Sequence, residues 1–154
     1  MNSFLAAALL LDALGPQAVP AAVGIPKWAV AIMPSGADYS LEIAADAASR
    51  ERGYMFREKV GPREGMLFIF DHSGRYGFWM KNCKASLDIL WLDERLRIVD
   101  MALNRPPCPE DGNCPSIEPI GPSRYVLEFA AGVAVKHKLK RGDRIFIVSE
   151  PAIP

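Results

Sequence analysis

Apolar residues along this chain recur in short runs that suit β-strands better than long helices. Over residues 39–44, Tyr39, Leu41 and Ile43 alternate with other side chains, which predicts a strand with one buried face. Residues 66–70, MLFIF, are apolar at every position and predict a strand that is buried on both faces. The same criteria predict further strands over residues 28–33, 76–81, 87–92, 96–102, 124–129 and 144–149.

Caps and turns divide these strands and leave room for only short helices. Asp46 is a suitable N-cap for a helix over residues 47–52, and Gly53 is a natural residue just past its end. The sequence also predicts a second helix over residues 131–139, turns over residues 71–75 and 93–94, and a loop over residues 104–123. That loop contains six prolines, which exclude regular structure. We therefore expect a mainly β, single-domain antiparallel β-sandwich or jelly-roll-like barrel with one or two short helices.

The N-terminal segment has the pattern of a secretory leader. Its apolar run, Phe4 to Leu11, is too short to span a bilayer, which needs roughly 20 apolar residues. We predict a signal peptide over residues 1–21, an extension with a first strand over 22–38, and one β-sandwich domain over 39–150. An N-terminal helix that docks on the domain is the alternative. The leader predicts a periplasmic or extracellular protein whose mature domain is not stably inserted in a membrane.

Charge and cysteine content narrow the partners and the compartment. The 154 residues carry 18 Lys and Arg against 18 Asp and Glu, so nucleic acid is not an expected partner. Cys108 and Cys114 flank a short polar loop, and a disulfide between them would agree with export. Zinc is the rival use of this pair, but only His72 and His137 could complete the ligand set, and neither has finger-like spacing. We expect the disulfide, with no metal and no other cofactor.

Several blocks of this sequence resemble one known family. They are RGYMFRE (52–58), GMLFIF (65–70), FWMKN (78–82), LDILWLD (87–93), YVLEFAAG (125–132) and LKRGDRI (139–145). In this order they resemble the domain of unknown function 192 family of bacteria and archaea. The resemblance implies a small jelly-roll-type β-sandwich and implies no particular activity. Such proteins usually carry Thr where this chain has Cys83, so this thiol is a poor candidate for a chemistry common to the family.

The stretch RYGFWMKN, residues 75–82, contains the first candidate binding residues. If residues 76–81 form a strand, Trp79 and Lys81 share one face, and Asn82 follows at the strand end. An indole for stacking, an ammonium group and an amide for orientation suit the binding of a polar ligand. The alternative is structural: Lys81 pairs with Asp88, and Asn82 holds the loop between two strands.

Two arginines and a glutamate extend the candidate site. Arg52 and Arg57 could bind a carboxylate or phosphate together, although Arg52 could equally form an ion pair with Asp88 or Glu128. Glu128 lies in a predicted strand, and if its face of the sheet is covered it needs a cation as partner. Asp88 and Glu128 could also form the carboxylate pair of a hydrolase.

These observations together predict an exported, non-catalytic β-sandwich that binds a small polar or anionic ligand, such as a saccharide or an envelope metabolite. The predicted ligand-binding residues are Arg52, Arg57, Trp79, Lys81, Asn82, Asp88 and Glu128. A hydrolase that uses Asp88 or Glu128 is one alternative. The other is a structural accessory module of an envelope complex.

Overall fold

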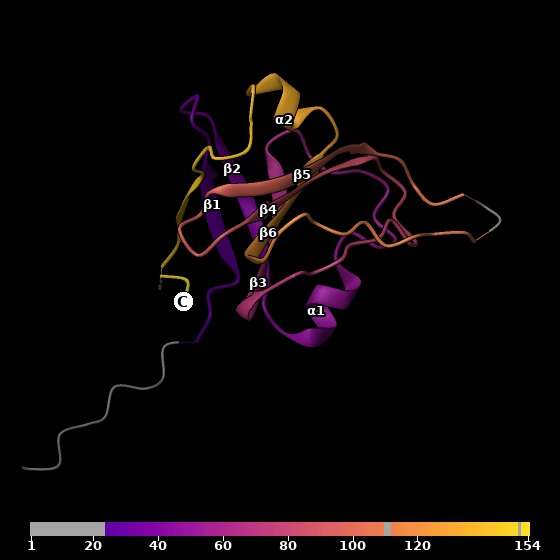
Figure 1. Ribbon diagram of the computed structural model, residues 1–154, viewed down its shortest axis with the longest axis horizontal. Coiled ribbons are helices and arrows are strands. Elements are labelled where there is room, and N and C mark those ends of the chain that lie inside the picture. The colour runs from indigo at the N-terminus through magenta and orange to yellow at the C-terminus, as the bar shows by residue number, and fades with distance from the viewer. Residues whose placement is uncertain (1–23, 110–111, 151) are drawn as a thin grey trace, which may run out of the picture.

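The computed structural model describes residues 24–109, 112–150 and 152–154 (Figure 1). The predicted signal peptide over residues 1–21 lies outside this part of the chain. The strands are β1 (Trp28–Ile32), β2 (Asp38–Ala44), β3 (Glu64–Gly74), β4 (Leu87–Leu92), β5 (Ile98–Arg105), β6 (Ser123–Ala130) and β7 (Phe146–Val148). The helices are α1 (Ala47–Arg52) and α2 (Val133–Lys136), which lie at opposite ends of the molecule in Figure 1. No helix in the described ranges has both the length and the apolar content needed to cross a bilayer.

All seven strands belong to one curled sheet with the order β5-β4-β6-β3-β2-β1-β7. Every adjacent pair is antiparallel except β2 and β3, which are parallel and are connected by the crossover that contains α1. An isolated antiparallel β-bridge pairs the backbones of Arg97, next to β5, and Arg144, next to β7, and so links the two edges of the sheet. Beside it, the Ile98 N–H donates to the Asp143 carbonyl at 2.9 Å. The sheet is therefore almost closed into a barrel, and the predicted mainly β, mostly antiparallel fold class is confirmed.

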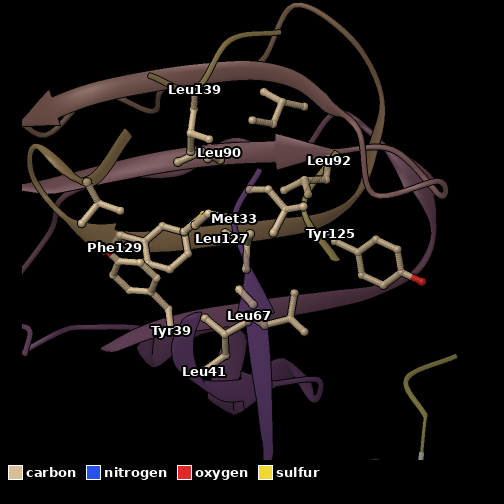
Figure 2. Close-up of a cluster of buried hydrophobic side chains, with 14 of the residues drawn as sticks. Met33, Tyr39, Leu41, Leu67, Leu90, Leu92, Tyr125, Leu127, Phe129 and Leu139 are labelled. Carbon is tan, nitrogen blue, oxygen red and sulfur yellow. The ribbon is translucent and has the colours of Figure 1, made fainter. Parts of the chain in front are cut away.

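The main hydrophobic core fills the inside of this curl. Side chains from β2, β3, β4 and β6 point toward one another there, and Leu67, Leu90 and Leu127 lie at its centre (Figure 2). Tyr125 belongs to the same cluster, but its hydroxyl points out of it and donates to the carbonyl of Pro154. The alternation of Tyr39 and Leu41 seen in the sequence corresponds to the inner face of β2.

The three central strands are also buried on their outer face. A second cluster there includes Phe68 of β3, Trp91 of β4 and Val126 of β6, all 1% exposed or less. Within residues 24–109, 112–150 and 152–154, no second sheet covers them. Irregular segments do so instead, with Phe78 packed edge-on against Phe68 at 4.9 Å between ring centroids, and with the Trp91 indole donating to the carbonyl of Tyr76 at 2.8 Å. This covering layer holds the candidate site.

Three sequence-based predictions of local structure are wrong. Residues 71–75 do not turn, because β3 continues to Gly74 through an irregular register with β6. Residues 76–81 are not a strand of the sheet, because they pack over its outer face and pair only at Phe78, with Ile117. The helix predicted over residues 131–139 is shortened to α2, since Gly132 and Lys138 at its two ends have positive φ angles of 92° and 53°.

Asp88 is a fully buried carboxylate that joins three elements inside the barrel. Its register partner is Phe129, whose side chain lies in the inner core, so Asp88 faces inward from β4. One oxygen accepts from the Asn104 N–H at 2.8 Å and the other accepts from the Ala134 N–H at 2.9 Å. Asp88 thus connects β4 to the end of β5 and to α2 through charge-assisted hydrogen bonds.

We expect the substitution Asp88→Asn to lower the free energy of unfolding by about 3 kcal/mol, because an amide NH₂ would then face a buried backbone donor. Urea unfolding monitored by fluorescence measures the loss. The matched control is Asp71→Asn on the exposed part of β3, which we expect to change stability by less than about 0.5 kcal/mol. Equal small effects at both positions would contradict a structural role for Asp88.

Candidate functional site

A cavity of about 340 Å³ lies between the outer face of the sheet and the segments that cover it. One wall consists of residues 50–55, the end of α1 and the turn that follows it. The opposite wall consists of residues 75–79 with Lys81 and Cys83. Phe68, Phe70 and Glu128 of the sheet complete the lining at the bottom. This space is called the α1 cavity below.

Capping interactions position the α1 wall. Asp46 caps the helix by accepting from the Ser49 N–H at 2.9 Å, as the sequence predicts, and Gly53 ends it with a φ of 44°. A Cβ atom on Gly53 would lie 3.3 Å from Phe68 Cζ and 3.7 Å from Glu128 Oε2. Glycine therefore lets the backbone after α1 approach the sheet closely at the cavity.

Glu128 is the buried acid of the α1 cavity. Only 4% of the residue is exposed, and within the described part of the chain its Oε2 atom has no hydrogen-bond partner. Its neighbours across β3 and β4 are Met66 and Ile89, which are apolar. Burial without a cation raises the pKa of Glu128 to about 8. The expectation that a covered Glu128 would have a cationic partner is therefore not met.

Two neighbouring groups respond to this carboxyl. Burial raises the pKa of Cys83 to about 11, and the negative charge of Glu128 adds to that rise. Burial and then Glu128 also raise the pKa of Tyr54. Cys83 is consequently a neutral thiol near neutral pH, which agrees with the sequence-based view that it is not a nucleophile.

Four cationic side chains line the α1 cavity, and two of them have no acceptor. Arg50 donates to the carbonyls of Ala45 and Ile69, and Arg75 donates to the carbonyl of Pro119 at 2.7 Å. The side chains of Arg52 and Lys81 are exposed, and neither makes a hydrogen bond or ion pair with another described residue, although Lys81 lies over the Trp79 ring. Their charges remain available to an anion.

Aromatic rings also line the cavity. Phe70 and Tyr76 are stacked with their centroids 3.6 Å apart, and Arg50 lies over Phe70 at 5.2 Å. Trp79 is 43% exposed, with the Lys81 Nζ atom 5.0 Å from its ring centroid. The sequence patterns identified Trp79 but not the other rings, because an aromatic residue in an apolar run is indistinguishable from a core residue.

The structure brings together four of the seven predicted site residues at the α1 cavity, namely Arg52, Trp79, Lys81 and Glu128. Arg57 lies outside the cavity, where it pairs with Glu42 at 2.7 Å and stacks over Tyr54. Asn82 lines a neighbouring hollow next to the Cys108–Cys114 loop, and its carbonyl accepts from the Phe56 N–H at 2.8 Å. This bond is made by the backbone, and the Asn82 side-chain amide lies 3.9 Å from the Met55 sulfur.

Asp88 does not reach the α1 cavity, because it points into the barrel from the opposite face of the sheet to Glu128. Ile89, not Asp88, is the cross-strand partner of Glu128. Both oxygens of Asp88 already accept from backbone amides, so the structure does not contain the pairing of Asp88 with Lys81 or with Arg52. The carboxylate pair that a hydrolase would need from Asp88 and Glu128 does not form either.

The cysteines and histidines offer no metal centre in the described residues. Cys108 and Cys114 form the predicted disulfide, and Cys83 is a free thiol. His137 lies between Ser35 and Tyr39, with a ring nitrogen 2.8 Å from each hydroxyl. Across residues 24–109, 112–150 and 152–154, no three His, Cys, Asp or Glu side chains are grouped as metal ligands.

The raised pKa of Glu128 predicts a specific pH dependence of stability. As the pH rises from 4.5 to 8, the unfolded chain releases the Glu128 proton while the folded chain keeps it. Over that window Glu128 destabilises the fold by up to about 1.4 kcal/mol per pH unit, with no further change above it. We expect Glu128→Gln, which cannot ionise, to become progressively more stable than the parent protein across the window. Urea unfolding at several pH values measures this difference in stability.

A stability difference between Glu128→Gln and the parent protein that stays constant with pH would contradict the buried, unpaired carboxyl. The control is Glu150→Gln at an exposed position, where the stability difference should not change with pH.

Comparison with known proteins agrees with this architecture. A protein from Sinorhizobium meliloti 1021, described as a candidate transcription regulator, is 33% identical with a TM-score of 0.69, covering 77% of this chain and 91% of its own. A protein of unknown function from Novosphingobium aromaticivorans DSM 12444 is 30% identical with a TM-score of 0.67, covering 77% of this chain and 83% of its own. No curated protein matches the sequence.

A family model described as "Uncharacterized ACR" matches residues 30–147, which include every strand from the middle of β1 to β7. The match extends over both walls of the α1 cavity and over Glu128. This chain therefore belongs to the domain of unknown function 192 family.

Proposed function

We propose that this domain binds a small polar or anionic ligand in the α1 cavity and does not catalyse a reaction there. The observation that carries the proposal is a buried carboxyl oxygen without a partner, in a hollow that two exposed cations also line. Arg52 and Lys81 carry charges with no acceptor among the described residues, and Glu128 has a buried oxygen with no donor. Groups that support only the fold are normally paired, as Asp88 is.

The size and lining of the cavity support a small molecule. About 340 Å³ is near the lower end of the volumes of small-molecule sites. Such sites combine apolar and aromatic walls with a few polar groups, as the α1 cavity does with Phe70, Tyr76 and Trp79. A structural accessory module would be expected to satisfy the buried Glu128 oxygen within the protein, so we favour binding over that alternative.

We also propose that the protein acts outside the cytosol, in the periplasm or beyond the cell. Two observations support this location. The Cys108–Cys114 disulfide is a bond that persists in oxidising compartments and is rare in the cytosol. The apolar run from Phe4 to Leu11 has the length of a secretory h-region.

The binding proposal predicts a ligand whose effect depends on Trp79. A thermal-shift screen of sugars, peptidoglycan fragments, nucleotides and carboxylates should yield at least one compound that stabilises the protein, by about 2.7 kcal/mol at a hundredfold excess over Kd. Trp79→Ala should abolish this stabilisation because the indole is an exposed part of the cavity lining. Trp28→Ala is the matched control, since Trp28 is also exposed but lies on β1. No stabilisation by any compound, or equal effects of the two substitutions, would count against the proposal.

The export proposal predicts that the first residues direct secretion. A fusion of residues 1–30 to alkaline phosphatase, which needs disulfides to be active, should give activity in intact bacterial cells. The same fusion without residues 1–23 should be inactive. Equal activity of the two fusions, or none in either, would contradict a leader in this segment.

A further inference from the structure

The ligand class follows from the kinds of polar and apolar groups that line the α1 cavity together, and this inference rests on the proposed binding function. Glu128 is the starting point because its Oε2 atom is buried and has no donor in the described chain. Two other buried acids show the usual arrangement: Asp88 accepts from two backbone amides, and Asp100 accepts from Ile120, Met101 and Arg141. Glu128 alone among these three acids lines the cavity, so the missing donor is one that a ligand can supply.

The surroundings of Glu128 determine what kind of donor fits. Tyr54, Cys83, Phe68 and the Gly53 backbone lie around the carboxyl, and the first two are the titratable groups that it influences. The charged groups of the cavity are on the covering segments: Arg50, Glu51, Arg52, Arg75 and Lys81. Cations outnumber acids in this lining, which disfavours the entry of an ammonium group. A hydroxyl is the donor that fits without bringing charge into the apolar surroundings.

Protonation of Glu128 supports the same choice. Burial raises its pKa to about 8, so near neutral pH the carboxyl is mostly protonated and can both donate to and accept from a hydroxyl. A protonated carboxyl gives no electrostatic advantage to a cationic donor. Hydroxyl recognition therefore agrees with both the geometry and the charge state.

The exposed cations of the cavity lining fit an acidic group on the ligand. Arg52 and Lys81 are exposed and lack acceptors in the described chain, while Arg50 and Arg75 use their donors on backbone carbonyls. A carboxylate or phosphate can accept hydrogen bonds from the guanidinium and the ammonium groups. The same lining includes the aromatic rings of Phe70, Tyr76 and Trp79, which form an apolar aromatic wall for the ring of a ligand.

We infer that the α1 cavity binds a monosaccharide that carries an anionic group. Its ring lies on the aromatic wall, its carboxylate or phosphate contacts Arg52 and Lys81, and a ring hydroxyl donates to Glu128 Oε2. The cavity volume of about 340 Å³ suits one sugar ring with its substituents better than a longer chain. Carboxylate and phosphate share the chemistry that the cations recognise, and the choice between them is left to the measurement.

Isothermal titration calorimetry of the full chain with four defined probes tests this inference. Glucuronate and glucose 6-phosphate carry both an acid and hydroxyls, glucose carries hydroxyls alone, and inorganic phosphate carries the acid alone. We expect at least one of the acidic sugars to bind about tenfold or more tightly than glucose and than phosphate. The tighter of the two acidic sugars identifies the anionic group.

Substitutions of Glu128 test its contact with the hydroxyl. Glu128→Leu should weaken binding of the preferred acidic sugar about tenfold or more, and should raise the melting temperature because it removes an unsatisfied buried group. Ser123→Ala is the matched control: Ser123 Oγ is also buried without a partner in the described chain and also lies on β6, but Ser123 is not part of the cavity lining. It should leave the affinity within about twofold of that of the parent protein. Glu128→Gln, which keeps an acceptor, provides a second folded variant and should retain part of the affinity.

Three results would overturn the inference. One is an affinity for the acidic sugar that is unchanged in Glu128→Leu. Another is phosphate binding as tightly as the acidic sugars, which contradicts hydroxyl recognition and leaves the anion-binding proposal intact. The third is no binding of either acidic sugar. In that case a different compound found in the thermal-shift screen, and lost in Trp79→Ala, would still support the proposed function, whereas no compound at all would contradict both.

Discussion

The burial of three central strands on both faces is the constraint on which this structure depends. β3, β4 and β6 contribute Leu67, Leu90 and Leu127, respectively, to the inside of the barrel, and Phe68, Trp91 and Val126 to the outer face. The described residues form a single sheet, so irregular segments cover its outer face. Loops leave hollows where a second sheet or a helix would interlock more closely, and the α1 cavity is such a hollow. The site is thus a consequence of how this sheet is covered.

The two buried acids of the central strands differ in whether the protein satisfies their oxygens. Asp88 faces inward and joins β4, β5 and α2, with a backbone amide for each oxygen. Glu128 faces outward, and its buried Oε2 atom has no partner in the described chain. Both carboxyls cost free energy to bury, but only that of Asp88 is offset by the surrounding backbone. A buried polar group whose burial is not offset by hydrogen bonds within the protein is a candidate for contact with a ligand.

The charges of the α1 cavity follow the same division. Arg50 and Arg75 stabilise the covering segments through backbone carbonyls, and Arg57 does so through Glu42. Arg52 and Lys81 have no comparable role. A cationic side chain therefore stabilises the fold where a hydrogen-bond acceptor of the protein lies within its reach. Where no such acceptor lies within reach, its charge remains unpaired. The candidate site consists of those side chains that remain unpaired.

The sequence alone determined the fold class and most elements, because alternation and capping are local properties. The alternation of Tyr39 and Leu41 gave β2, the capping of Asp46 gave α1, and the apolar run of residues 66–70 gave a strand buried on both faces. The same kind of alternation at residues 76–81 predicted a strand of the sheet, and this prediction was wrong. That segment lies over the sheet instead of in it. Local pattern also could not tell that Asp88 and Glu128 point to opposite faces, since that depends on the register between β4 and β6. Partner choice, and with it the site, was decided by tertiary structure, because a side chain's partners come from strands and loops distant in sequence.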